Sequence, residues 1–107
     1  MRQLIFIMAA MLLTACANDV TIVTGKVQDA IAMDEVELLF GKNPACDFEE
    51  VAWMQFPGNY FNQESIINSF RHEAAELGAS AVQIIDLQKM DTSEYRGSAR
   101  ALRCKPA

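Results

Sequence analysis

The sequence predicts a small α+β fold in which one helix packs on one face of an antiparallel or mixed β-sheet. Residues 62–78 show the apolar periodicity of a single amphipathic helix. The segments on both sides of it are short, rich in β-branched residues or alternating in polarity, and bounded by turn residues. Together they give the order β-β-α-β-β, and a length of 107 residues allows one domain.

Residues 1–15 have the features of a lipoprotein signal peptide. Arg2 supplies the positive charge, and residues 4–13 form an unbroken apolar run. Because a bilayer span needs about 20 apolar residues, this run has the length of a signal peptide. It ends in Leu-Thr-Ala-Cys at residues 13–16, which resembles the lipobox of bacterial lipoproteins. We therefore expect cleavage before Cys16, with diacylglycerol on its thiol and a further chain such as palmitate on its amine.

The residue after Cys16 indicates which of the two membranes carries the protein. In Gram-negative lipoproteins an aspartate at this position commonly causes retention in the inner membrane, and this chain has Ala17. We expect an outer-membrane protein that faces the periplasm, with the inner membrane as the less favoured location. Residues 16–33 would form the lipidated N-terminus and a short tether, or contain an edge strand within 21–27, and residues 34–107 would form the domain.

Two strands are predicted before the helix, over residues 35–40 and 49–56. Turn residues between Gly41 and Pro44 separate them, and Pro57-Gly58-Asn59 is expected to end the second strand.

The helix of residues 62–78 has recognisable ends and one apolar face. Asn62 is placed to cap its N-terminus, and Gly78 is placed just beyond its C-terminus. At 100° per residue, one arc contains Ile66, Ile67, Phe70, Ala74 and Leu77. His72 lies nearly opposite this arc, so we expect it in solvent.

A hairpin is predicted after the helix. Residues 81–89 contain β-branched side chains and are bounded by turn residues, residues 90–94 form a polar connection, and residues 95–104 alternate with a period of two.

Cys46 and Cys104 remain once Cys16 is assigned to lipid. In an oxidising periplasm two thiols allow one intramolecular disulfide, which we predict. A redox-active or metal-binding pair is the alternative, and it is less favoured because neither cysteine has Cys-x-x-Cys spacing.

Residues 70–82 and 95–104 carry a family resemblance. They resemble the core motif of small Gram-negative outer-membrane lipoproteins related to the RcsF envelope-stress sensor and of similar uncharacterised lipoproteins: an Ala-rich helix end, a Gly-Ala-Ser-Ala-Val turn into a strand, and a last strand ending in a disulfide-bonded cysteine. The resemblance implies the fold, the anchor and an envelope-stress role, and it matches Cys46 and Cys104 with the cysteines of the group. This chain lacks the long Pro-rich tether and the second disulfide of the stress sensor, and no signalling residue carries over.

Charge and motif content restrict the function. The formal net charge of −5 argues against nucleic-acid binding. His72 is the only histidine, and no spaced set of ligands accompanies it, so we predict no metal and no cofactor. Ser65 and Ser69 lie in no nucleophile motif, so we predict that the protein is not an enzyme.

An aromatic cluster surrounds the Pro57-Gly58 turn and consists of Trp53, Phe56, Tyr60 and Phe61. Such a cluster either packs in the core or, together with the exposed His72, forms a surface for a partner or for the membrane interface. We therefore expect a non-enzymatic envelope sensor or interaction lipoprotein that binds an outer-membrane or periplasmic protein. The alternative is a metal-binding or redox-active periplasmic lipoprotein.

Overall fold

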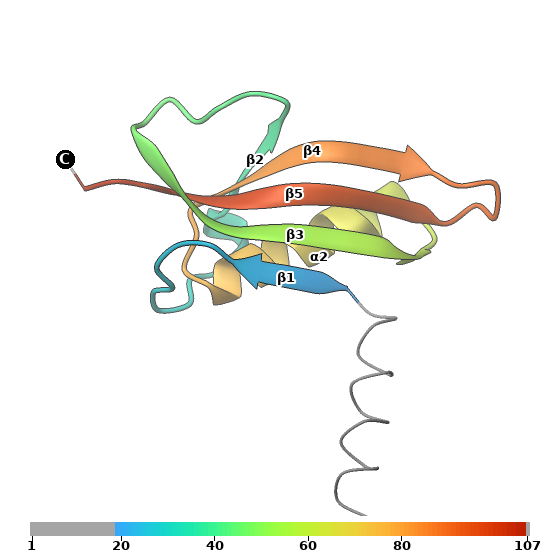
Figure 1. Cartoon of the computed structure of the whole chain (residues 1–107), viewed down its shortest axis with the longest axis horizontal. Helices are drawn as coiled ribbons and strands as arrows, with labels where there is room; N and C mark the ends of the chain where they lie inside the picture. Colours follow the sequence, from blue (N-terminus) through green and yellow to red (C-terminus); the bar gives the residue numbers. More distant parts are fainter. Residues whose placement is uncertain (1–18, 107) are drawn as a thin grey trace, which may run out of the picture.

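The computed structural model describes residues 19–106, so the predicted signal peptide and the predicted lipidation site Cys16 lie outside the described residues. In chain order the elements are β1 (Val20–Val23), the 3-10 helix η1 (Met33–Glu35), β2 (Glu37–Phe40), β3 (Phe48–Tyr60), α2 (Gln63–Glu76), β4 (Ala81–Lys89) and β5 (Tyr95–Cys104) (Figure 1). No helix among these residues is long and apolar enough to cross a membrane. The predicted α+β class is confirmed.

The five strands form one mixed sheet in the order β1-β3-β5-β4-β2. β2 runs parallel to β4, and all other neighbours are antiparallel. The predicted hairpin is present as β4 and β5, and an edge strand is present as β1, which begins one residue earlier than the expected range of 21–27 and ends at Val23. β2 and β3 are consecutive in the chain, yet β4 and β5 lie between them in the sheet.

β3 is longer than predicted, and the expectation that Pro57-Gly58-Asn59 ends it is wrong. β1 pairs only with Ala52–Gln55 of β3, so Pro57 lies where β3 has become an edge strand. An edge position does not require the amide hydrogen that proline lacks. The register is irregular between Phe56 and Tyr60, where Asn59 adopts φ 71°. This irregularity accommodates the turn residues without ending the strand.

α2 begins and ends as predicted. The Asn62 side chain accepts a hydrogen bond from the Ser65 amide at 2.8 Å, which caps the first turn. Gly78 follows the last turn with φ 73°, a conformation that glycine adopts without steric cost. The Arg71 guanidinium donates to the carbonyl oxygens of Met33 and Val36, which fixes η1 against the helix.

The main core lies between α2 and one face of the sheet. Phe70 of the helix stacks on Phe56 of β3, with ring centroids 4.2 Å apart. The central strand β5 contributes the small, fully buried side chains of Ala99 and Ala101 here, and its first residue Tyr95 packs against the margin of the core. Small side chains let the helix approach the sheet closely, so the larger helix residues fill the interface. The buried helix residues are Ile66, Phe70, Ala74 and Ala75.

A second, smaller cluster lies on the opposite face of the sheet. It contains Leu39, Ala81 and Leu102, with Phe48 packed against it. The loop of residues 41–47 lies next to this cluster, and the Gln83 amide donates to the Lys42 carbonyl at 2.7 Å. This loop therefore covers one end of the helix-free face of the sheet.

Candidate partner-binding surface

α2 covers one face of the sheet, and it lies behind the sheet in Figure 1. On the other face Trp53 of β3 lies opposite Ile22 of β1 and Arg100 of β5. Directly opposed residues of paired strands project from the same face. We call the helix-free surface the open face, and its side chains include Ile22, Trp53, Gln55, Gln83, Asp86, Gln88, Arg96, Ser98 and Arg100. Trp53 is half-buried and Ile22 is 54% exposed, so apolar surface is accessible here.

A polar network fixes the centre of the open face. Arg100 donates through Nε to Gln83 Oε1 at 2.9 Å, and its Nη1 lies 3.7 Å from Glu50 Oε1. The Gln83 amide nitrogen in turn donates to the Lys42 carbonyl and to Asn43 Oδ1. Because both the oxygen and the nitrogen of the Gln83 side-chain amide are hydrogen-bonded, the Arg100 guanidinium is held in one position beside Trp53.

A shallow hollow of about 270 Å³ lies further along the open face. It is lined by Gln55, Phe56, Pro57, Asp86, Gln88, Arg96, Gly97 and Ser98. Arg96 is oriented there by two bonds to Gln88 Oε1, from Nε at 3.0 Å and from Nη2 at 2.8 Å. The hollow offers guanidinium, carboxylate, amide and hydroxyl groups, which suit hydrogen bonding to a polar chain.

A groove of about 590 Å³ lies on the helix side, between β1 and α2. Its lining includes Asp19, Tyr60, Ser69, His72 and Glu73. The Tyr60 hydroxyl donates a hydrogen bond to the Asp19 carboxylate. Burial, followed by this bond, raises the pKa of Tyr60 from its ordinary value of 10.0 to about 12.

His72 lies at the rim of this groove. Its side chain is 66% exposed, as the helical pattern predicts, and Nε2 lies 3.0 Å from Glu76 Oε1. Within residues 19–106 no three side chains of the His, Cys, Asp or Glu type converge to hold a metal ion.

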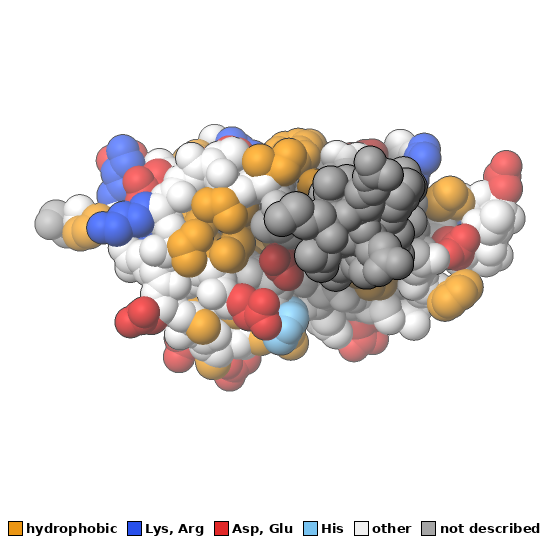
Figure 2. Space-filling view, turned by 60° about the horizontal axis from the view of Figure 1, so that its bottom comes forward, with side chains coloured by type: hydrophobic (Ala, Val, Ile, Leu, Met, Phe, Trp, Pro, Cys, Tyr) orange, Lys and Arg blue, Asp and Glu red, His pale blue; other side chains and the backbone are white. Residues whose placement is uncertain are grey.

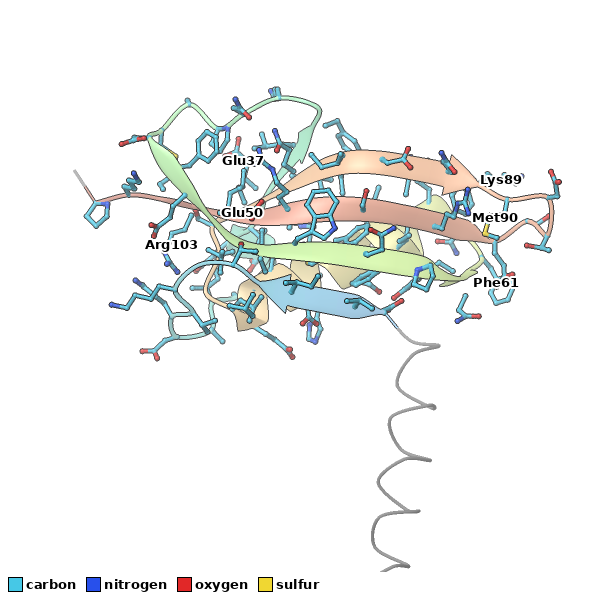
Figure 3. The ribbon with its side chains drawn as sticks, viewed as in Figure 1. Glu37, Glu50, Phe61, Lys89, Met90 and Arg103 are labelled. Carbon is cyan, nitrogen blue, oxygen red and sulfur yellow. A yellow bond between two sulfur atoms is a disulfide. The ribbon has the colours of Figure 1, made fainter. Side chains whose placement is uncertain are left out.

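The structure separates the aromatic candidates predicted from the sequence. Phe56 is only 3% exposed and stacks on Phe70, so its inclusion among the surface candidates is wrong and it is a core residue. Trp53 lies on the open face, whereas Tyr60 lies in the groove on the helix side with His72. Phe61 is 74% exposed and lies beyond the end of β3, at the same end of the sheet as Lys89 and Met90 (Figure 3). These residues therefore do not form one surface.

The two cysteines form the predicted disulfide. Cys46 and Cys104 are bonded with their Cα atoms 5.6 Å apart, which joins the loop before β3 to the end of β5. The bond secures residues 41–47 beside the open face.

Sequence reasoning missed the polar network of Arg100, Gln83 and Glu50. The alternation of residues 95–104 places Arg96, Ser98 and Arg100 on one side of a strand, and this was the available signal. It does not reveal that β3 and β4 supply the neighbouring groups.

Comparisons with protein-family models, with curated proteins and with solved structures gave no match.

Proposed function

We propose that this protein is a lipoprotein anchored through Cys16 on the periplasmic face of the outer membrane, and that it is a non-enzymatic interaction module or envelope sensor. The observation that carries the proposal is the open face: Trp53 and Ile22 expose apolar area beside the fixed Arg100 guanidinium. Tryptophan and arginine are the residues most enriched among binding hot spots. Groups held in place before binding lose less entropy when a partner docks.

The anchor supports a partner close to the membrane. Cys16 lies three positions before Asp19, and three extended residues span at most about 11 Å. The Tyr60 hydroxyl bonds Asp19, and β1 follows at once. The open face would thus lie within reach of the loops of an outer-membrane protein or of another lipoprotein. The resemblance of residues 70–82 and 95–104 to RcsF-related lipoproteins supports a sensing role.

The geometry of the groove favours binding over catalysis. Its hydroxyl groups are those of Thr21, Tyr60 and Ser69. Tyr60 bonds the Asp19 carboxylate, and its pKa, raised to about 12, keeps this hydroxyl protonated and weakly nucleophilic. The His72 imidazole at the rim of the groove pairs with Glu76.

Crosslinking in cells tests the interaction. A photoreactive residue at Gln55 or Arg96, both exposed on the open face, should capture the same protein repeatedly. The matched control is Gln63, which is exposed at the start of α2 and should capture nothing. Equal capture from Gln63 and Gln55 would refute a specific surface.

Two further measurements test the anchor and the alternative function. Labelled fatty acid should enter the wild-type protein and not Cys16→Ser. A Cys16→Ser protein that still takes up label would refute the anchor. A stoichiometric metal that is lost in His72→Ala, with no crosslinked protein, would replace the proposal with the metal-binding alternative.

A further inference from the structure

The exposed apolar side chains of the domain are concentrated on one side. Eight large hydrophobic residues are exposed among those that the structure describes. Six of them are Val20, Ile22, Val23, Val27, Met33 and Phe61. They belong to β1, to the loop that follows it, to η1 and to the end of β3. The other two, Phe40 and Ile85, lie on β2 and β4 at the opposite edge of the sheet.

The six residues share the β1 side of the molecule. Val20, Ile22 and Val23 lie on the edge strand itself. Met33 lines the groove between β1 and α2 together with Thr21. Phe61 lies just past the end of β3, on the same side of the sheet as β1 (Figure 3). Figure 2 shows this side, with hydrophobic side chains on more than one part of it. We call these six residues the apolar edge.

The N-terminal connection leaves the domain at the apolar edge. Asp19 directly precedes Val20, and its carboxylate is bonded by Tyr60, the neighbour of Phe61. Cys16 is at most about 11 Å from Asp19. A lipid on Cys16 would therefore bring the bilayer to this side of the domain and not to the edge with Phe40 and Ile85.

We propose that the apolar edge rests on the lipid surface, with Phe61 and the β1 side chains in the headgroup region; this inference rests on the lipid anchor of the proposed function. Aromatic and aliphatic side chains gain free energy when they leave water for the interface. The anchor supplies the proximity, so a modest apolar area is sufficient to orient the domain. Ile22 belongs to both surfaces, so the open face then meets the membrane at its β1 margin, and Trp53 and Arg100 remain accessible to a protein.

The charges near the apolar edge define the kind of lipid contact. Three acidic residues, Asp29, Asp34 and Glu35, are exposed close to Val27 and Met33, against one exposed lysine, Lys26. In Figure 2 acidic side chains lie among the hydrophobic ones, and basic side chains lie mainly toward the ends. Electrostatic attraction to anionic headgroups therefore does not hold this surface, and apolar contact does. The contact should weaken when anionic lipid is added at low salt.

A probe attached at two positions tests the orientation. With Cys16 acylated and Cys46 bonded to Cys104, a cysteine introduced by Phe61→Cys is the sole free thiol. An environment-sensitive fluorophore is attached there in the full lipidated protein, which is then reconstituted in phosphatidylethanolamine and phosphatidylglycerol vesicles containing nitroxide-labelled lipid. The matched control is Phe40→Cys, which changes an exposed phenylalanine on the far edge.

The lipid quencher should reduce emission from position 61 at least about twofold more than from position 40, since an interfacial side chain lies within about 10 Å of the headgroup boundary. Raising the phosphatidylglycerol content at low salt should reduce this difference. Equal quenching at both positions, in protein that still floats with the vesicles, would overturn the inference and leave the anchor intact.

Two other outcomes would also overturn the inference. A fluorophore at position 61 that is already shielded from water before vesicles are added would mean that another part of the chain or a second copy covers the apolar edge. Shielding of the same fluorophore in native membranes but not in the lipid vesicles would mean that a protein covers the apolar edge. A protein that carries no lipid and does not float would refute the anchor itself, so the two failures are distinguishable.

Discussion

The hydroxyl of Tyr60 donates a hydrogen bond to the carboxylate of Asp19, 41 positions earlier in the chain. This bond joins the end of β3 to the residue that precedes β1. β1 pairs with β3 only over Ala52–Gln55, so Tyr60 provides a second attachment for the N-terminal end of the domain.

The first prediction concerns alkaline stability. The pKa of Tyr60 is about 12 in the folded protein and near 10.0 in the unfolded chain. Because the folded state holds the proton more tightly, this stabilisation is fully present below about pH 10 and is lost as the pH rises toward about 12. In denaturation experiments across this pH range, the free energy of unfolding of Tyr60→Phe should not show this decrease. Parallel loss in both proteins would contradict the assignment.

The second prediction concerns the disulfide. Cys46 and Cys104 are 58 residues apart, and closing a loop of this size stabilises a domain by roughly 4 kcal/mol in the chain-entropy model. Changing both cysteines to serine should lower the free energy of unfolding by about this amount. Urea denaturation measures it. Reduction should destabilise the wild-type protein and leave the double variant unchanged; a reductant effect on the variant would point to another cause.

The third prediction compares two phenylalanines. Phe70 is fully buried and stacks on Phe56, so Phe70→Ala should cost about 3–5 kcal/mol. Phe61 is 74% exposed, and Phe61→Ala should change the free energy of unfolding by no more than about 0.5 kcal/mol. Similar costs for the two would show that Phe61 packs in the core, and would remove it from the apolar edge.

The fourth prediction concerns the end of α2. Gly78 has φ 73°, and a Cβ atom there would lie 2.7 Å from the Asp29 carbonyl oxygen. Gly78→Ala should therefore cost more than about 1 kcal/mol. Gly58 serves as the control, because a Cβ atom there meets nothing within 4 Å. Thermal unfolding compares the two variants, and equal melting temperatures would contradict the packing of residues 28–29 on the helix end.

Local signals in the sequence were sufficient for several elements. Asn62 and Gly78 bracket α2 because capping depends on one or two neighbouring residues. The β4–β5 hairpin follows from its polar connection of five residues. The prediction that β3 ends at Pro57 was wrong because proline is tolerated where a strand has no neighbour on one side. The sequence does not reveal that β1 pairs only with Ala52–Gln55 and leaves Pro57 at an edge.

The order of the strands and the open face required the structure. Nothing near residues 37–40 indicates that β2 pairs in parallel with β4, because that contact spans the whole of β3 and α2. Arg100 meets Gln83 and Glu50 only through this topology. Phe56 was misplaced for the same reason, as its partner Phe70 lies on the helix.

The central position of β5 bears on the timing of folding. β5 is the last strand that the structure describes, yet it joins β3 to β4 and so holds the two halves of the sheet together (Figure 1). A chain that emerges N-terminus first, from a ribosome or through a translocation channel, lacks this strand until residue 104 has emerged. Its earlier strands cannot complete the five-stranded sheet before then, and Cys46 cannot yet bond Cys104. The topology thus delays completion of the sheet until residues 95–104 have emerged.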